Sequence, residues 1–148
     1  MAPLEAALFE SGRPVLIAPP VPPLELGRKV LVAWNGSTEQ ARTNAFAMPL
    51  LRKAEQVTVL TVEGGMTPGP AGDAVALSLV RNGVPATAVT VAPGVRTTGE
   101  AILDHAKALG CDLLVKGAYA QSRLRQMIFG GTTRHILANA TLPVLMAH

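Results

Sequence analysis

The chain has 148 residues, enough for one domain with a substantial core that needs neither disulfides nor metals. Hydrophobic residues make up 49% of the sequence but aromatic residues only 3%, so aliphatic side chains must build that core. The net charge is +3, and Lys and Arg never occur in runs longer than two, a scatter that argues against nucleic-acid binding.

From residue 29 to the end, apolar runs of strand length alternate with stretches of helical periodicity. The first run ends at the turn residues Asn35 and Gly36. Later runs are rich in β-branched residues or alternate in polarity, as strands do. The predicted strands cover residues 29–34, 57–62, 86–92, 112–116 and 142–147.

The first connection between strands carries a helix with a start signal and an internal breaker. Ser37 is the expected N-cap, with Gln40 three residues later as a capping-box partner. Apolar residues then repeat at helical spacing as far as Leu51. Because Pro49 falls inside this pattern, we predict a kink or break near Met48.

The remaining connections also carry helix signals. Asp73 is expected to cap a helix that stops before the turn at residues 82–83. Thr97 and Glu100 have the spacing of a capping box, and Gly110 ends that helix. A last helix is predicted over residues 132–140, directly before the final strand.

This alternation is typical of parallel strands joined by right-handed crossovers. We therefore predict an α/β domain, a five-stranded parallel sheet with helices on both faces. Ligands of such sheets bind beyond the carboxyl ends of the strands, where the strand order reverses. Here that point is expected between the first strand, which ends at Asn35, and the fourth, which ends at Gly117.

The first residues of the chain are not part of the five predicted strands and the helices between them. Residues 8–18 align with residues 137–147, and five of the eleven positions are identical. We interpret residues 3–18 as the last helix and strand of a preceding repeat, an extra N-terminal helix-strand unit. With its Pro-rich linker this unit covers residues 1–26, and the full domain covers residues 27–148. A chance match of two ordinary strands is the alternative.

Glycines mark the segment after the fourth strand. Gly117 leaves that strand, and Gly130 and Gly131 lead through Thr132 and Thr133 into the last helix. Glycines in such a place let backbone N–H groups approach an anion, which a helix N-terminus also favours. The same residues also fit a tight turn with a threonine N-cap, and their spacing does not decide between the two.

Several classes of protein are not expected. The only cysteine, Cys111, allows no internal disulfide and is interpreted as a semi-buried filler rather than a reactive thiol. No apolar stretch reaches the length of a membrane span, and Glu5 and Glu10 argue against a signal peptide, so we expect a cytoplasmic protein without membrane contact. The histidines have no metal-site spacing, and neither a serine-hydrolase elbow, a dinucleotide fingerprint nor a P-loop is present.

Four segments together resemble the universal stress protein family. They are residues 30–37 (VLVAWNGS), 112–124 (DLLVKGAYAQSRL), 128–137 (IFGGTTRHIL) and 142–145 (LPVL). The resemblance extends over residues 27–147, and residues 3–18 look like the tail of the first domain in two-domain members. It implies a flavodoxin-like fold of the adenine nucleotide alpha hydrolase type.

In nucleotide-binding members of that family, a Gly-x2-Gly-x9-Gly-(Ser/Thr) motif grips the phosphates and an Asp after the first strand contacts the nucleoside. The resemblance therefore implies a site for ATP, AMP or another adenine nucleotide, with Mg where a nucleotide is bound, and with no catalytic residue and no metal ligand. The positions that it assigns to nucleotide binding are Ala33, Asn35, Gly117, Ala120, Ser122, Gly130, Gly131, Thr132 and Thr133.

Three of these positions depart from the family pattern. Ala120 replaces a glycine where the backbone can require positive φ. Gly131 removes a hydroxyl for which Thr132 or Thr133 can substitute, and Asn35 lacks the charge of an aspartate. At about 1 kcal/mol for each loss, the affinity falls by roughly two orders of magnitude. We therefore expect a degenerate adenine-nucleotide pocket.

Basic residues near this pocket have two interpretations each. Arg123, Arg125 and Arg134 fit either phosphate partners or solvated surface residues. Lys116 stands where the family usually carries an apolar residue. It either brings an ammonium group to the phosphates or points to solvent.

The resulting hypothesis is a non-catalytic stress-response module that forms a homodimer through its C-terminal strand, its N-terminal strand or both. We expect residues 14–18 to pair with residues 143–147, within one chain or by exchange between two. One alternative is a weak nucleotide hydrolase or transferase that uses the same pocket, although Glu100 and Asp112 lie at the wrong ends of their elements to assist. The other is a purely structural module with a vacant pocket.

Overall fold

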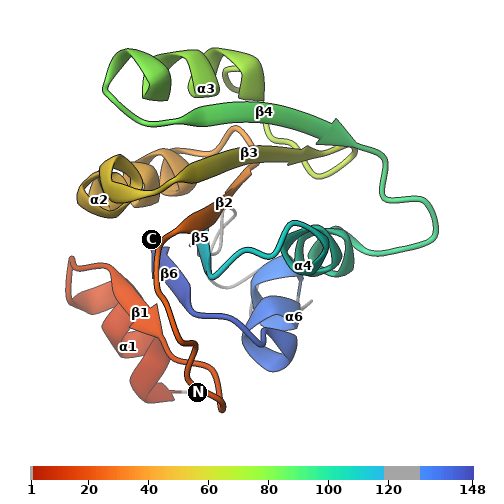
Figure 1. Cartoon of the computed structure of the whole chain (residues 1–148). Coiled ribbons are helices and arrows are strands. Elements are labelled where there is room, and N and C mark those ends of the chain that lie inside the picture. Colours follow the sequence, from red (N-terminus) through yellow and green to blue (C-terminus); the bar gives the residue numbers. More distant parts are fainter. Residues whose placement is uncertain (1, 119–130) are drawn as a thin grey trace.

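The computed structural model of the chain describes residues 2–118 and 131–148 (Figure 1). Helices and strands alternate along it as predicted. The helices are α1 (Ala2–Glu10), α2 (Thr38–Lys53), α3 (Gly72–Arg81), α4 (Thr98–Ala108) and α6 (Thr132–Asn139). The strands are β1 (Val15–Ile17), β2 (Lys29–Trp34), β3 (Gln56–Val62), β4 (Ala86–Val91), β5 (Leu113–Gly117) and β6 (Val144–Ala147).

These strands form one six-stranded sheet in the order β1-β6-β5-β2-β3-β4. Every neighbouring pair is parallel except β1 and β6. The chain adds β3 and β4 on one side of β2 and then β5 and β6 on the other, so the strand order reverses between β2 and β5, as predicted. The α/β fold class is confirmed, and β1 makes the sheet one strand wider than predicted.

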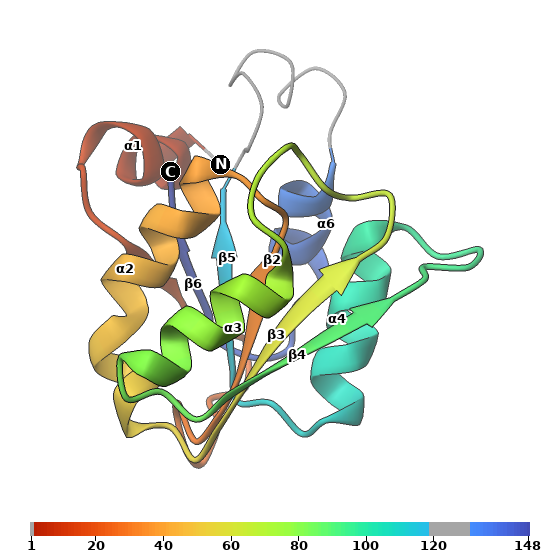
Figure 2. The same ribbon diagram turned by 90° about the horizontal axis from the view of Figure 1, so that it is seen from above.

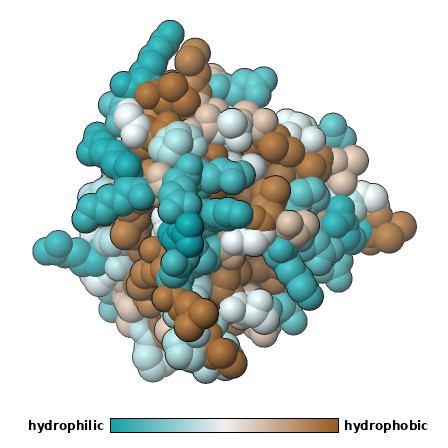
Figure 3. All heavy atoms as spheres, in the orientation of Figure 1, coloured by the Kyte–Doolittle hydropathy of each residue, from teal (hydrophilic) through white to brown (hydrophobic). Residues whose placement is uncertain are grey.

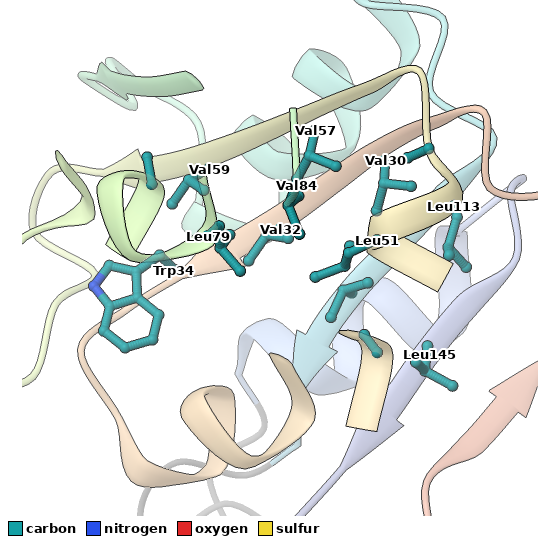
Figure 4. Packing of buried hydrophobic residues seen from close by; sticks show 14 residues of the cluster. Val30, Val32, Trp34, Leu51, Val57, Val59, Leu79, Val84, Leu113 and Leu145 are labelled. Carbon is teal, nitrogen blue, oxygen red and sulfur yellow. The ribbon is translucent and has the colours of Figure 1, made fainter. Parts of the chain in front are cut away.

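One face of the sheet is covered by α2 and α3 (Figure 1). Val32 and Trp34 of β2 pack there against Leu51 of α2 and Leu79 of α3 (Figure 4). The indole N–H of Trp34 donates to the Pro70 carbonyl at 2.8 Å, so burial leaves it paired. This face is a predominantly aliphatic core, as the low aromatic content indicates.

The opposite face is covered by α4 and α6, and α1 lies next to β1 at the edge of the sheet. Leu31 and Ala33 of β2 point to this side because successive strand residues face opposite ways. Ile102 of α4 and Ile136 of α6 are buried against them, and Leu8 of α1 joins the same cluster. The N-terminal segment is therefore part of the core.

The helix start signals are correct at two helices and wrong at a third. Ser37 caps α2 through its hydroxyl, but Gln40 is not a capping-box partner, because its side chain donates to the Val115 carbonyl and accepts from the Gly117 N–H. The capping box that begins at Thr97 is present at α4. Asp73 is not the cap of α3. That helix begins at Gly72, and its N-cap is Ala71, which has no side-chain acceptor. Packing of α3 against the sheet therefore sets its start without help from a cap.

Helix α2 runs unbroken from Thr38 to Lys53 although Pro49 lies within it. Of the kink or break predicted near Met48, the break is absent. Pro49 stands about one turn from the end of the helix, where it removes a single backbone hydrogen bond. Ala47 and Leu51 on either side of it are fully buried, and this packing outweighs the lost bond.

The N-terminal segment repeats the structure of the C-terminal one. Helix α1 ends at Glu10 and α6 ends at Asn139, which are equivalent positions of the repeat, and each helix is followed by a strand. Strand β1 pairs with β6 in antiparallel fashion within the chain, which confirms the predicted pairing. Leu16 lies opposite Leu145, its own counterpart in the repeat. The pairing is therefore self-complementary, the property of an interface built around a two-fold axis.

On the face seen in Figure 3, hydrophilic and hydrophobic side chains are interspersed. Large apolar side chains that are fully exposed, Leu24 and Val95, lie in connecting segments. Scattered exposed apolar residues of this kind are ordinary in globular domains. None of the described helices combines the length and the hydropathy needed to cross a membrane.

Candidate functional site

A cavity of about 260 Å³ opens where the parallel strands end. It lies at the edge of the sheet toward which β2, β3 and β5 point, beside the first turns of α4 and α6 (Figure 2). This is the reversal point of the strand order, the usual ligand site of open α/β sheets. The lining residues that matter below are Ala33, Asn35, Lys116, Gly131, Thr132 and Thr133.

The charged group in the described wall of this cavity is a buried lysine. Leu113 and Val115 of β5 belong to the α2/α3 core, so Leu114 and Lys116 point to the other face. Lys116 is only 4% exposed, and its Nζ donates to the Gly117 carbonyl at 2.7 Å. Burial lowers the pKa of Lys116 to about 8. Of the two interpretations given above, the one in which Lys116 points to solvent is wrong.

This ammonium has no acidic side chain beside it. The described residues that line the cavity include neither Asp, Glu nor His. The sequence of residues 119–130 contains no acidic residue either. Within the described part, the hydrogen bond to Gly117 is the one polar contact of Lys116. Its charge is therefore uncompensated by any carboxylate side chain that could reach it.

Asn35 sits at the end of β2 and turns the chain into α2. Its side-chain oxygen accepts from the Ser37 N–H at 3.1 Å and from the Ser37 hydroxyl at 2.6 Å, an Asx turn. A backbone N–H can only donate, so the orientation of the Asn35 amide is fixed. Its NH₂ group makes no hydrogen bond to the described residues. Asn35 therefore offers the cavity a donor, whereas its acceptor is already used.

Two helices begin at this cavity. Thr98 starts α4, Thr132 starts α6, and both line the wall. The first N–H groups of a helix lack partners within it and carry partial positive charge. Together with Lys116 and the amide of Asn35, they surround the cavity with donors and positive potential. Such an environment is suited to an anionic ligand that is rich in acceptors.

The loop after β3 forms a wall that the sequence interpretation did not assign to the site. Residues 64–67 line the cavity, and Thr67 donates to the Asn35 carbonyl from its N–H at 2.8 Å and from its hydroxyl at 3.1 Å. Gly36, at φ +82°, lies against the Thr67 carbonyl, where a side chain would not fit. The signal that could have located this wall is the density of Gly and Pro in residues 63–72.

Gly117 does not line the cavity. It follows Lys116 in β5, and neighbouring strand residues face opposite ways. Its N–H donates to the Gln40 Oε1 at 2.6 Å, and a Cβ on it would lie 2.6 Å from the Gln40 backbone nitrogen. Gly117 therefore allows α2 to approach the sheet closely.

The structure thus brings together part of the site assigned by resemblance. Ala33, Asn35, Gly131, Thr132 and Thr133 line one cavity, and Gly117 is not among its lining residues. Arg134 is exposed on α6. Positions outside the described residues are Ala120, Ser122, Arg123, Arg125 and Gly130.

Other candidate groups lie away from this cavity. Cys111 is half-buried, and burial followed by the nearby Asp112 raises the pKa of its thiol to about 11, so it stays protonated at neutral pH. Within residues 2–118 and 131–148 no group of three or more His, Cys, Asp or Glu residues could hold a metal ion. The site is therefore best described as a donor-lined cavity in an α/β sheet.

Comparison with known proteins relates this α/β domain to a protein family. Residues 76–148, from α3 to the end of the chain, match the model of the universal stress protein family. A stretch of 47 residues, 32% of the chain, is 36% identical to the stress response protein NhaX of Bacillus subtilis strain 168 and spans 28% of that relative. Residues 76–148 are therefore a universal stress protein family match, and the structural neighbours given next are universal stress proteins as well.

Solved structures agree on the fold. A universal stress protein from Archaeoglobus fulgidus DSM 4304 superposes with a TM-score of 0.72 at 19% identity, over 92% of this chain and 50% of that one. This chain thus spans about half the length of that protein. A universal stress protein in complex with cAMP superposes with a TM-score of 0.57 at 16% identity, over 82% of this chain and 97% of that one.

Proposed function

We propose that this chain is a non-catalytic stress-response module whose cavity binds an adenine nucleotide. The observation that carries the proposal is the meeting of Lys116, the Asn35 amide and the starts of α4 and α6 around one cavity. These groups come from four separate segments, and all of them are hydrogen-bond donors or positive charges that suit an anionic ligand rich in acceptors. A structural neighbour that was solved with cAMP, itself an adenine nucleotide, supports this ligand class. Residence in the cytoplasm is part of the proposal.

The nucleoside end of the pocket is proposed to be the weak end. An aspartate at position 35 would offer an oxygen to a ribose hydroxyl in addition to any bond it makes to its own turn. The Asn35 oxygen already accepts two hydrogen bonds from Ser37 and has none to spare. Recognition would therefore rest on the phosphate end, with Mg bound only through the nucleotide's own phosphates.

An enzyme that works from the same cavity is the second candidate, and the chemistry of the wall disfavours it. A hydrolase or phosphotransferase needs a general base or a carboxylate that holds a metal near the phosphates. No described lining residue is an Asp, Glu or His. A purely structural module with a vacant pocket is the third candidate, which calorimetry separates from the first.

The proposal is tested by calorimetric titration with ATP, ADP, AMP and cAMP on the unmodified protein and on Thr132→Glu. The new carboxylate lies at the start of α6, where it suits the helix dipole but repels a phosphate. The matched control is Ala138→Glu, exposed near the other end of the same helix. We expect binding to the unmodified protein and the control, and a loss of about tenfold or more in Thr132→Glu.

Three results would count against this function. Absence of heat at millimolar nucleotide would favour the structural module. Equal affinity in Thr132→Glu and Ala138→Glu would move the ligand away from α6. Steady release of inorganic phosphate from ATP would favour the enzyme.

Assembly as a homodimer is also proposed. Strand β1 already pairs with β6 inside the chain, so a dimer that uses β6 requires residues 2–18 to be exchanged between two copies. The self-complementary register, in which Leu16 faces its repeat counterpart Leu145, supports such an exchange because the equivalent segment of another copy fits the same edge. Light scattering on the full chain and on a variant that lacks residues 2–18 tests it. A chain that stays monomeric at all concentrations in both forms would contradict it.

A further inference from the structure

Lys116 is the one feature of the cavity that packing does not explain. Its neighbour in the sheet is Met146, and the wall around it includes Leu60 and Ile102, all apolar. An uncharged side chain of similar length would fill this position without cost. A buried ammonium, by contrast, loses its hydration and is tolerated only where something compensates for it.

The compensation inside the chain is incomplete. A lysine has three N–H donors, and within the described residues one of them is used, by the Gly117 carbonyl. The elements packed on this side contribute Thr98, Thr132 and Thr133 to the cavity wall and no titratable side chain. The starts of α4 and α6 add positive potential, which makes the position of Lys116 still less favourable. An anion bound beside the ammonium would complete the compensation.

We propose that Lys116 is the residue that selects the ligand. Its buried ammonium requires an anionic group, above all a phosphate, that binds between the ammonium and the starts of α4 and α6. The inference rests on the proposed function for the adenine part of the ligand but not for the anionic part. Compounds that carry a phosphate bind, and the corresponding neutral nucleoside binds far more weakly. The cavity is thereby a sensor of phosphorylated ligand and not of the nucleoside.

The experiment compares AMP, adenosine and inorganic pyrophosphate by calorimetry on the unmodified protein, on Lys116→Met and on Lys53→Met. Methionine keeps the length of the side chain and removes the charge, and Lys53 is an exposed lysine at the far end of α2. We expect the unmodified protein and Lys53→Met to prefer AMP over adenosine by about 10- to 100-fold. In Lys116→Met this preference should shrink to about threefold or less.

A second readout separates an electrostatic role from a structural one. Near pH 8.5 the AMP phosphate is fully ionised, so protons taken up on binding report on the protein. Binding to the unmodified protein should take up a fraction of a proton, measured as a difference in heat between buffers of different ionisation enthalpy. Lys116→Met should take up none and should keep the circular dichroism of the folded chain.

The outcomes distinguish the two proposals. Binding of AMP with the same preference over adenosine in Lys116→Met overturns the inference and leaves the proposed function standing. Failure of AMP and adenosine to bind, together with binding of pyrophosphate that depends on Lys116, overturns the adenine part and supports the inference. Absence of binding for all three compounds overturns both.

Discussion

The two faces of the sheet are built from the same kinds of residues, but one is a closed core and the other opens into a cavity. On the α2/α3 face, Val32, Trp34 and Leu51 close a core that contains no charge (Figure 4). On the α4/α6 face, the core opens toward the carboxyl edge into a cavity, and a buried lysine lies in its wall. A single strand, β5, supplies both environments by alternation, since Val115 points to one face and Lys116 to the other. The α2/α3 face is therefore core alone, whereas the α4/α6 face also holds the cavity to which we assign ligand binding.

The largest expected effect is a difference in the loss of unfolding free energy between a substitution in the closed α2/α3 core and one beside the cavity. Leu51→Ala leaves a void in a fully buried site and should cost about 4 kcal/mol of unfolding free energy. Ile102→Ala borders the existing cavity, where the space is already partly open, and should cost about 2 kcal/mol. Urea denaturation measures both. A larger loss in Ile102→Ala would contradict the division between the faces.

The next effect concerns the glycine that the family motif assigns to phosphate. Gly117→Ala pushes a methyl group against the Gln40 backbone and should destabilise the chain by about 1–3 kcal/mol. Gly65→Ala, which lines the cavity, meets the side chain of Thr98 instead and should cost less. If Gly117→Ala reduces nucleotide binding and leaves the melting temperature unchanged, the packing role given to Gly117 is wrong.

An effect of comparable size, with a characteristic pH dependence, is expected from the buried charge. In the unfolded chain Lys116 keeps its proton up to about its ordinary pKa near 10.5, but in the folded chain it releases it above about 8. The unfolded state therefore binds more protons in this window, and stability rises with pH. Lys116→Met should be more stable than the unmodified protein by about 3 kcal/mol at pH 7, and the difference should vanish near pH 10.5. A difference that does not change with pH would contradict this explanation.

The smallest effect is expected from a charge outside both faces. Arg28 forms ion pairs with Glu25 and Glu55 at the amino end of the sheet, and all three side chains are exposed. Hydrogen bonding to Glu55 raises the pKa of the Arg28 guanidinium, which is charged at neutral pH in any state. Exposed pairs of this kind contribute little and are screened by salt. Arg28→Ala should leave the urea midpoint within experimental error.

Most of the fold could be predicted because each strand and helix signal is local. The β-branched run of β3 and the capping box at Thr97 need no knowledge of distant contacts. The errors came where tertiary packing overrides a local signal. Pro49 sits inside a continuous helix because Ala47 and Leu51 anchor that turn, and Asp73 is passed over because α3 begins where it meets the sheet.

The site was harder to predict because a motif records residue types and not the side to which they point. The spacing that places Gly117 in the motif says nothing of α2, against which it packs. The strand alternation that sends Lys116 into the cavity was present in the sequence and could have decided between its two interpretations. The wall made by residues 64–67 depends on contacts between Thr67 and Asn35, which are distant in the chain.

The central claim is that an uncompensated ammonium faces the cavity, and an NMR titration of lysine ¹³Cε resonances tests it most directly. The Lys116 signal is assigned by its loss in Lys116→Met. We predict a midpoint of about 8 that moves upward when pyrophosphate or AMP is added. A midpoint at the ordinary lysine value, unchanged by either compound, would contradict the account.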